Sequence, residues 1–172
     1  MSSFKAFTAL YSRLLSGLLV FSVAVLIFPV SLQIFSRYTS LIPSYIWTEE
    51  MARFLFVWMI MIGAMIGIRE STHFDVDVWP RLSTRGTALL KIVASVFILG
   101  FALVFIWGGW LFTRFAWNRL SELAELPLWT IHIAFPLAGV TWVLFQGEQL
   151  VDAVKVVLRG ASESSDETGA RA

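Results

Sequence analysis

Long apolar segments separated by shorter polar stretches dominate the chain. A helix needs about 20 mainly apolar residues to cross the hydrocarbon core of a membrane. Four segments meet this requirement, and we expect spans at about residues 14–35, 45–69, 92–112 and 128–150. The pattern therefore predicts an all-α integral membrane protein with four transmembrane helices, forming a single membrane domain over residues 1–159.

The start of the second span follows from its length. Its charge-free core, residues 54–68, covers only about 22 Å at 1.5 Å per residue, which is too short to cross a bilayer. The helix must therefore begin near Tyr45. This start places Glu49, Glu50 and Arg53 in the outer turns of the helix.

Composition agrees with a membrane location. The chain is 58% hydrophobic and 15% charged, whereas soluble domains are roughly 45–50% apolar and about 25% charged. The net charge of +1 leaves no basic excess for binding nucleic acid. The absence of cysteine excludes disulfides, thiolate catalysis and Cys-ligated metals. Residues 160–172 are small, polar and acidic, so we expect a disordered tail there.

The distribution of basic residues predicts the orientation, because cytoplasmic loops carry an excess of Lys and Arg. The chain has 13 Lys and Arg residues. Nine lie in the N-terminal tail, the second loop and the C-terminal tail: Lys5, Arg13, Arg69, Arg81, Arg85, Lys91, Lys155, Arg159 and Arg171. Four lie on the other side: Arg37, Arg53, Arg114 and Arg119. Both termini are therefore expected in the cytoplasm.

Ionisable residues near the membrane are candidates for function, because burying them in lipid is unfavourable. Glu49 and Glu50 lie four and three residues before Arg53, so all three can meet on one side of the helix. An ion pair that fixes the helix end is the simplest interpretation. A charged contact with a partner subunit and a proton or ion relay are the alternatives.

The same helix carries Gly63 and Gly67, a small-xxx-small pair on roughly the same stripe as Arg53. Small residues let helices approach closely in lipid. This pair predicts close packing, either within the four-helix bundle or against another chain.

The inner end of the second span contains His73, Asp75 and Asp77 shortly after Arg69. The H-x-D-x-D spacing resembles a metal site, since alternate positions of an extended segment point the same way. No further ligands are evident, so we favour a polar connector near Arg69 and predict no metal site.

A pair of histidines in a four-span protein suggests an alternative, a haem- or quinone-binding membrane anchor of a redox enzyme. His73 and His132 are expected at opposite membrane faces, about 25–30 Å apart, so one iron cannot bind both within a single chain. Nucleophile, phosphate-loop and zinc-protease motifs are also absent from the sequence. We therefore expect neither an enzyme nor a bound cofactor.

The second span and the loop after it carry a family resemblance. Trp47-Thr-Glu49-Glu50-Met-Ala-Arg53, followed by Trp58, Gly63-Ala64, Arg69 and His73-Phe-Asp-Val76-Asp77, resembles the small membrane subunit of tripartite ATP-independent periplasmic (TRAP) transporters, the DctQ-like family. The ordered set covers about 30 residues, and the four spans fit the same family. The positions that match are Glu49, Glu50, Arg53, Gly63, Arg69, His73 and Asp77, and Gly67 belongs to the small-xxx-small pair of the same helix.

The resemblance implies a subunit of a transporter in the bacterial inner membrane. In such systems a periplasmic binding protein captures an organic acid, and a large multi-span membrane subunit moves it, driven by a sodium gradient. The small subunit binds the large one and resembles a fixed scaffold beside its moving domain. From their places along the second span and the loop after it, we expect partner-interface or structural roles for these residues and for Gly67.

Overall fold

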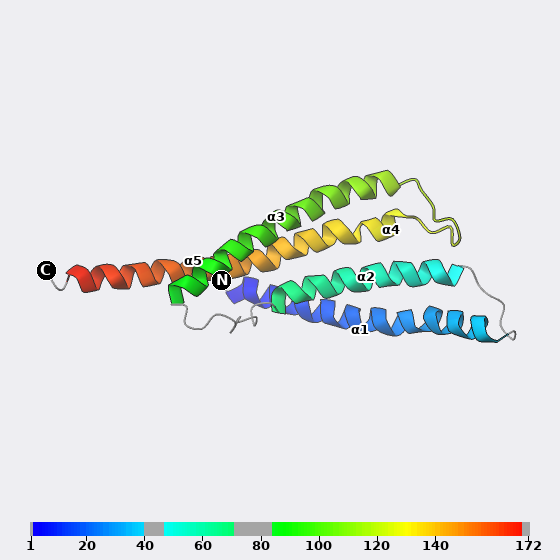
Figure 1. Ribbon diagram of the computed structural model, residues 1–172, viewed down its shortest axis with the longest axis horizontal. Helices are drawn as coiled ribbons and strands as arrows, with labels where there is room; N and C mark the ends of the chain where they lie inside the picture. Colours follow the sequence, from blue (N-terminus) through cyan, green and yellow to red (C-terminus); the bar gives the residue numbers. More distant parts are fainter. Residues whose placement is uncertain (1, 40–46, 71–83, 170–172) are drawn as a thin grey trace.

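The structure, a computed structural model, describes residues 2–39, 47–70 and 84–169. These residues form four long helices and a short one: α1 (Ser2–Tyr38), α2 (Trp47–Glu70), α3 (Thr84–Ala116), α4 (Trp129–His132) and α5 (Ala134–Gly169) (Figure 1). Four helical segments are long and apolar enough to span a membrane, the last comprising α4 and the start of α5. The predicted all-α fold with four spans is therefore confirmed.

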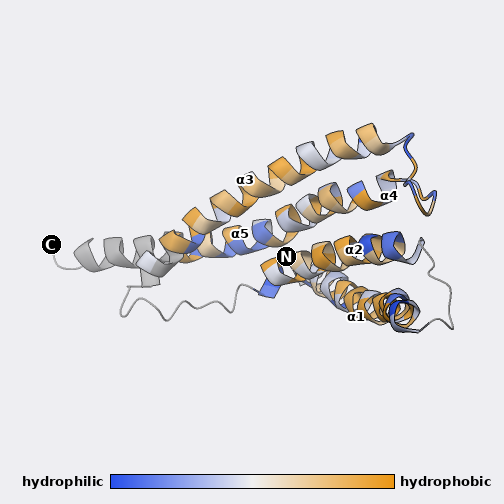
Figure 2. Ribbon diagram, turned by 45° about the vertical axis from the view of Figure 1, so that its right-hand side comes forward, coloured by the Kyte–Doolittle hydropathy of each residue, from blue (hydrophilic) through white to orange (hydrophobic). Residues whose placement is uncertain are grey.

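The helices form two antiparallel hairpins that lie side by side. α1 packs on α2, and α3 packs on α4 and α5, while α2 and α5 meet in the middle (Figure 1). α1 and α3 are therefore the outer helices; most of their residues are apolar (Figure 2), and many of these side chains are exposed. Both chain termini lie at one end of the bundle, called here the termini end. The opposite end, where residues 117–128 connect α3 to α4, is called the loop end.

The helices extend beyond the spans expected from hydropathy. α1 begins at Ser2 instead of about residue 14, and α3 runs from Thr84 to Ala116 instead of from about residue 92 to residue 112. Apolar length reports only the part of a helix that lies in hydrocarbon, whereas the helix itself continues through the headgroup region. Pro29 lies inside α1 without ending it.

The fourth span contains an interruption that hydropathy did not predict. The structure has α4 ending at His132 and α5 beginning at Ala134, where one helix over residues 128–150 was expected. Pro136 explains the break, because its ring clashes with the carbonyl of the residue four positions earlier, which is His132. The chain recovers helical bonding at once, with the Leu137 N–H donating to the Ile133 carbonyl at 3.2 Å.

The C-terminal part of α5 also differs from the sequence expectation. A disordered tail was expected over residues 160–172, whereas the helix continues to Gly169. Elongation adds one backbone hydrogen bond for each residue, and no proline follows Pro136 to stop the helix.

The tightest packing joins α3 to α5 through two glycines. A Cβ atom at Gly109 would lie 2.6 Å from Pro136 Cδ, and one at Gly139 would lie 2.7 Å from the Ala102 carbonyl oxygen. Both distances are shorter than a real Cβ contact, so only glycine permits this approach of the two backbones. Close approach matters because lipid supplies no hydrophobic driving force between helices.

The two neighbouring glycines of α3 provide a direct test. Gly109→Ala should lower the free energy of unfolding by about 1–3 kcal/mol, because the new methyl group forces α3 away from Pro136. Gly108→Ala is the matched control, since a Cβ there meets nothing within 4 Å; it should stay within about 0.5 kcal/mol or gain from better helix propensity. Equilibrium unfolding in mixed micelles measures both values. Equal stability of the two variants would contradict the packing.

Candidate functional site

Glu50 connects the two hairpins at the loop end. It lies in the first turn of α2, and only 7% of its surface is exposed. Its Oε2 accepts hydrogen bonds from the backbone N–H groups of Leu123 and Ala124, at 3.2 and 2.6 Å. A buried carboxylate is tolerated when such donors replace water. Glu50 therefore holds the α3–α4 connection against α2.

The α3–α4 connection is itself an ordered turn. Leu120 and Pro127 form an antiparallel bridge, and the Ser121 N–H donates to the Leu126 carbonyl at 2.8 Å. Glu125 has φ 52°, a left-handed conformation that is uncommon outside glycine and asparagine. Glu50 accepts hydrogen bonds from the two consecutive N–H groups of Leu123 and Ala124 in this turn.

Glu49 takes a different partner. Its Oε1 accepts from the Arg53 guanidinium at 3.2 Å, and both side chains are more than half exposed. Such a pair contributes little stability, typically below about 1 kcal/mol. The sequence allowed Glu49, Glu50 and Arg53 to meet on one side, but the structure separates them into a surface ion pair and a buried contact with the loop.

Gly63 and Gly67 lie in open space. A Cβ at either position meets nothing within 4 Å among the described residues. With Arg53, Phe56 and Ile60 they form a stripe along α2, called here the α2 stripe, in which Phe56 is 49% and Ile60 is 44% exposed. The buried residues of α2 are on other sides of the helix. The glycine pair therefore does not serve close packing between the described helices of this chain.

Arg69 joins three helices at the termini end. Its guanidinium donates to the Thr8 carbonyl on α1 and lies over the Phe145 ring of α5, 5.3 Å from the ring centroid. The Gln149 amide of α5 donates to the Ile68 carbonyl beside it, at 2.9 Å. Arg69 thus ties the end of α2 to both of its neighbours.

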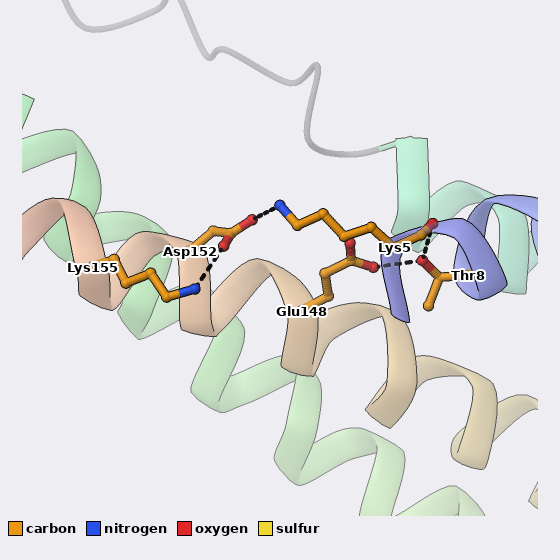
Figure 3. Close-up of polar contacts among 5 residues, drawn as sticks. All are labelled: Lys5, Thr8, Glu148, Asp152 and Lys155. Carbon is orange, nitrogen blue, oxygen red and sulfur yellow. Dashed lines mark hydrogen bonds and ion pairs between the residues drawn. The ribbon is translucent and has the colours of Figure 1, made fainter. Parts of the chain in front are cut away.

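A second set of polar contacts links α1 to α5 at the same end (Figure 3). The Lys5 ammonium pairs with Asp152 at 2.7 Å, and Lys155 pairs with the same carboxylate at 3.4 Å. The Thr8 hydroxyl lies 2.9 Å from Glu148 Oε2. The Lys5–Asp152 and Thr8–Glu148 contacts join residues 147 and 140 positions apart, whereas Lys155 and Asp152 lie three positions apart on α5.

Sequence reasoning missed this cluster although a signal for it existed. Glu148 and Asp152 lie one helical turn apart at the end of an apolar segment, where an ionisable residue is unusual. The expected first span began at about residue 14, which left Lys5 and Thr8 outside the bundle. In the expected fold, Glu148 and Asp152 therefore had no residues of the first helix to pair with.

The histidine predictions are only partly addressed by the structure. His132 lies half-buried at the loop end, with Nδ1 2.7 Å from the Leu128 carbonyl and its ring stacked on Phe112 at 5.9 Å. His73 and Asp77 lie outside the described residues, so the expected separation of the two histidines stays a prediction. Within the described ranges, no three His, Asp or Glu residues are grouped as metal ligands are.

The fold and these contacts define a four-span helical membrane protein whose spans are tied together by charged and polar side chains at both ends. The chain belongs to the DctQ family: the family described as tripartite ATP-independent periplasmic transporters, DctQ component, matches residues 26–156. Members are small permease components of TRAP transporters and are not enzymes.

Three relatives illustrate the family. A Haemophilus influenzae protein named as a TRAP transporter small permease is 27% identical over 114 residues, which cover 66% of this chain and 71% of the relative. The sialic acid TRAP transporter small permease protein SiaQ of Vibrio cholerae is 28% identical over 130 residues, 70% of each chain. The isethionate TRAP transporter permease protein DctMQ of Oleidesulfovibrio alaskensis is 25% identical over 128 residues, which cover 70% of this chain and 20% of that one.

The role of Glu50 can be tested against its neighbour. Glu50→Ala leaves two N–H groups of the loop unpaired, which should lower the free energy of unfolding by about 1–3 kcal/mol. The amide hydrogens of Leu123 and Ala124 should also exchange faster with solvent. Glu49→Ala removes only the exposed pair with Arg53 and should change stability by less than about 0.5 kcal/mol. Unchanged protection of both amides in Glu50→Ala would exclude the proposed contact.

Proposed function

We propose that this chain is the scaffold subunit of a TRAP-type secondary transporter, binding a large multi-span membrane subunit and carrying no transport activity alone. The proposal rests on the partners of the charged side chains in the spans. Glu50, Arg69 and Asp152 contact groups of this same chain. They serve the assembly of its helices, whereas a substrate site needs polar groups that converge on a ligand.

The large subunit is proposed to bind along the α2 stripe. The exposed Phe56 and Ile60 supply apolar surface, and Gly63 and Gly67 leave room for a second helix to approach closely. The fused relative DctMQ supports a neighbouring permease, because the matched region occupies only 20% of that polypeptide. The exposed Glu49–Arg53 pair lies where the stripe begins at Arg53, and it is suited to a charged contact at the edge of the interface.

The expected orientation places the termini end in the cytoplasm of a bacterial cell and the loop end in the periplasm, in the inner membrane. Nine of the 13 Lys and Arg residues fall on the side assigned to the cytoplasm. The α3–α4 connection, held by Glu50, would then face a periplasmic substrate-binding protein. His73 and Asp77 are proposed to act in the cytoplasmic connection between the second and third spans.

The transported compound is proposed to be an organic acid, and its uptake is proposed to be driven by a sodium gradient. Two relatives carry the names of organic acids, sialic acid and isethionate. The sodium gradient follows from the family resemblance. In this proposal the binding protein and the large subunit recognise the substrate, and this chain supports the large subunit.

Co-purification tests the proposed interface. The tagged chain should recover one larger multi-span membrane protein in about equal amount from native membranes in mild detergent. Gly63→Leu and Gly67→Leu should reduce this recovery roughly 10- to 100-fold, because a side chain in a close helix contact costs about 1–3 kcal/mol.

The control for this experiment is Gly100→Leu on α3. A Cβ at Gly100 also meets nothing within 4 Å, so the variant tests whether any new leucine on the bundle surface has the same effect. It should recover the large subunit like the unchanged chain. Recovery of the chain alone, as a defined oligomer, would refute the scaffold function, and recovery of a flavin or iron–sulfur subunit would indicate a redox anchor.

Reconstitution tests the coupling. Liposomes that contain this chain with its large subunit should take up the organic acid only when the binding protein and an inward sodium gradient are supplied. Omitting this chain, or supplying it alone, should reduce uptake to the level of empty liposomes. Uptake by the isolated chain would overturn its assignment as a non-transporting subunit.

A further inference from the structure

A groove of about 530 Å³ lies at the termini end, between the start of α1 and one side of α5. α1 contributes Phe4 and Lys5, and α5 contributes residues from Val143 to Lys155 at successive helical turns. The groove plays no part in the proposed contact with the large subunit, because the α2 stripe is formed by other residues on another helix.

The lining changes from apolar to charged along the helix axis. Val143, Leu144 and Gly147 form the apolar part, and the charged residues Glu148, Asp152 and Lys155 lie toward the termini end, with Val151 among them. Residues 143 and 155 are about 18 Å apart along α5 at 1.5 Å per residue. One leaflet of the hydrocarbon core is about 15 Å thick, half of the full thickness. The groove therefore has the length and the polarity gradient of a single lipid molecule.

Gly147 provides independent support for an open channel in the apolar part. It lines the groove at its middle, and a Cβ added there would meet nothing within 4 Å. Any larger side chain at this position would project into the space that an acyl chain would occupy. The channel is thus open because residue 147 is a glycine.

The charged part presents cations that can hold a phosphate. Lys5 and Lys155 approach the Asp152 carboxylate from two sides, and the Lys5 side chain remains 53% exposed (Figure 3). An ammonium group has three donors, and the contact with Asp152 uses one donor of Lys5. Glu148, the other acid of the groove, is turned toward the Thr8 hydroxyl. Lysine side chains beside an apolar groove can bind the phosphate of a phospholipid headgroup.

We propose that this groove binds a membrane phospholipid, with its phosphate held by Lys5 and Lys155 and one acyl chain lying along Val143, Gly147 and Val151. The lipid would fill the space between α1 and α5 and shield the Lys5–Asp152 pair from competing water.

Native mass spectrometry of the full chain tests this proposal. The chain is released from nanodiscs that contain equal amounts of phosphatidylglycerol and phosphatidylethanolamine, and the fraction that retains phospholipid is measured. The unchanged chain should retain one phospholipid. The double variant Lys5→Gln, Lys155→Gln should retain it at least about tenfold less often, because charge-assisted hydrogen bonds to the phosphate are lost. Arg37→Gln, which removes an exposed cation at the opposite end of α1, should retain it fully.

Gly147→Leu separates lipid binding from the stability of the bundle. This variant keeps the Lys5–Asp152 and Lys155–Asp152 pairs but fills the acyl channel, so it should also lose the phospholipid. Gly100→Leu is its control and should retain the lipid. Full retention in Gly147→Leu, or the absence of phospholipid from the unchanged chain, would overturn the proposal. The proposal would also be overturned if the complex with the large subunit carries no phospholipid and the lysine variants release the large subunit. A protein would then occupy the groove.

Discussion

Helices that already lie in a bilayer gain no hydrophobic free energy when they associate. Their association therefore depends on close backbone contact and on hydrogen bonds or ion pairs between polar groups. This chain uses each means for a different contact. Gly109 and Gly139 bring α3 and α5 together within one hairpin. Between the two hairpins, Glu50 binds the loop at one end, and Arg69 binds α1 and α5 at the other. A modest apolar core, with Met65 and Phe145 among its most buried side chains, lies between these ends.

Placing the polar contacts at the ends has a consequence for the rest of the surface. Charged groups there sit near the headgroup region, and the buried polar side chains farther inside the bundle, such as Thr141 and Gln146, are uncharged. In the most apolar part of α1 only 6% of the residues are buried, against 39% in the fourth span. The two-hairpin arrangement therefore leaves its outer helices facing lipid or another protein. A chain built in this way is held together at its own ends and leaves its sides accessible, which fits the proposed scaffold function.

The sequence predicted the features that depend on local composition and missed those that depend on long-range contacts. Four spans follow from apolar length, and the break before Ala134 could have been predicted from Pro136 by the same kind of local rule. The different roles of Gly108 and Gly109 could not have been predicted, because only the position of α5 distinguishes the two adjacent glycines. The same holds for Glu50, whose partners Leu123 and Ala124 are more than 70 residues away. Lys5 was missed because hydropathy cannot detect the polar first turns of a membrane helix.

The acidic pair shows how one short motif can combine two roles. Successive residues of an α-helix point about 100° apart, since 3.6 residues complete a turn. Glu50 can therefore face the loop while Glu49 remains beside Arg53 at the surface. The buried acid fixes the internal geometry of the bundle, and the exposed acid lies where the α2 stripe begins. Exchanging the two roles would require α2 to rotate about its axis, which would carry Gly63 and Gly67 out of their open positions. The orientation that lets Glu50 reach the loop is thus the one that keeps the α2 stripe accessible.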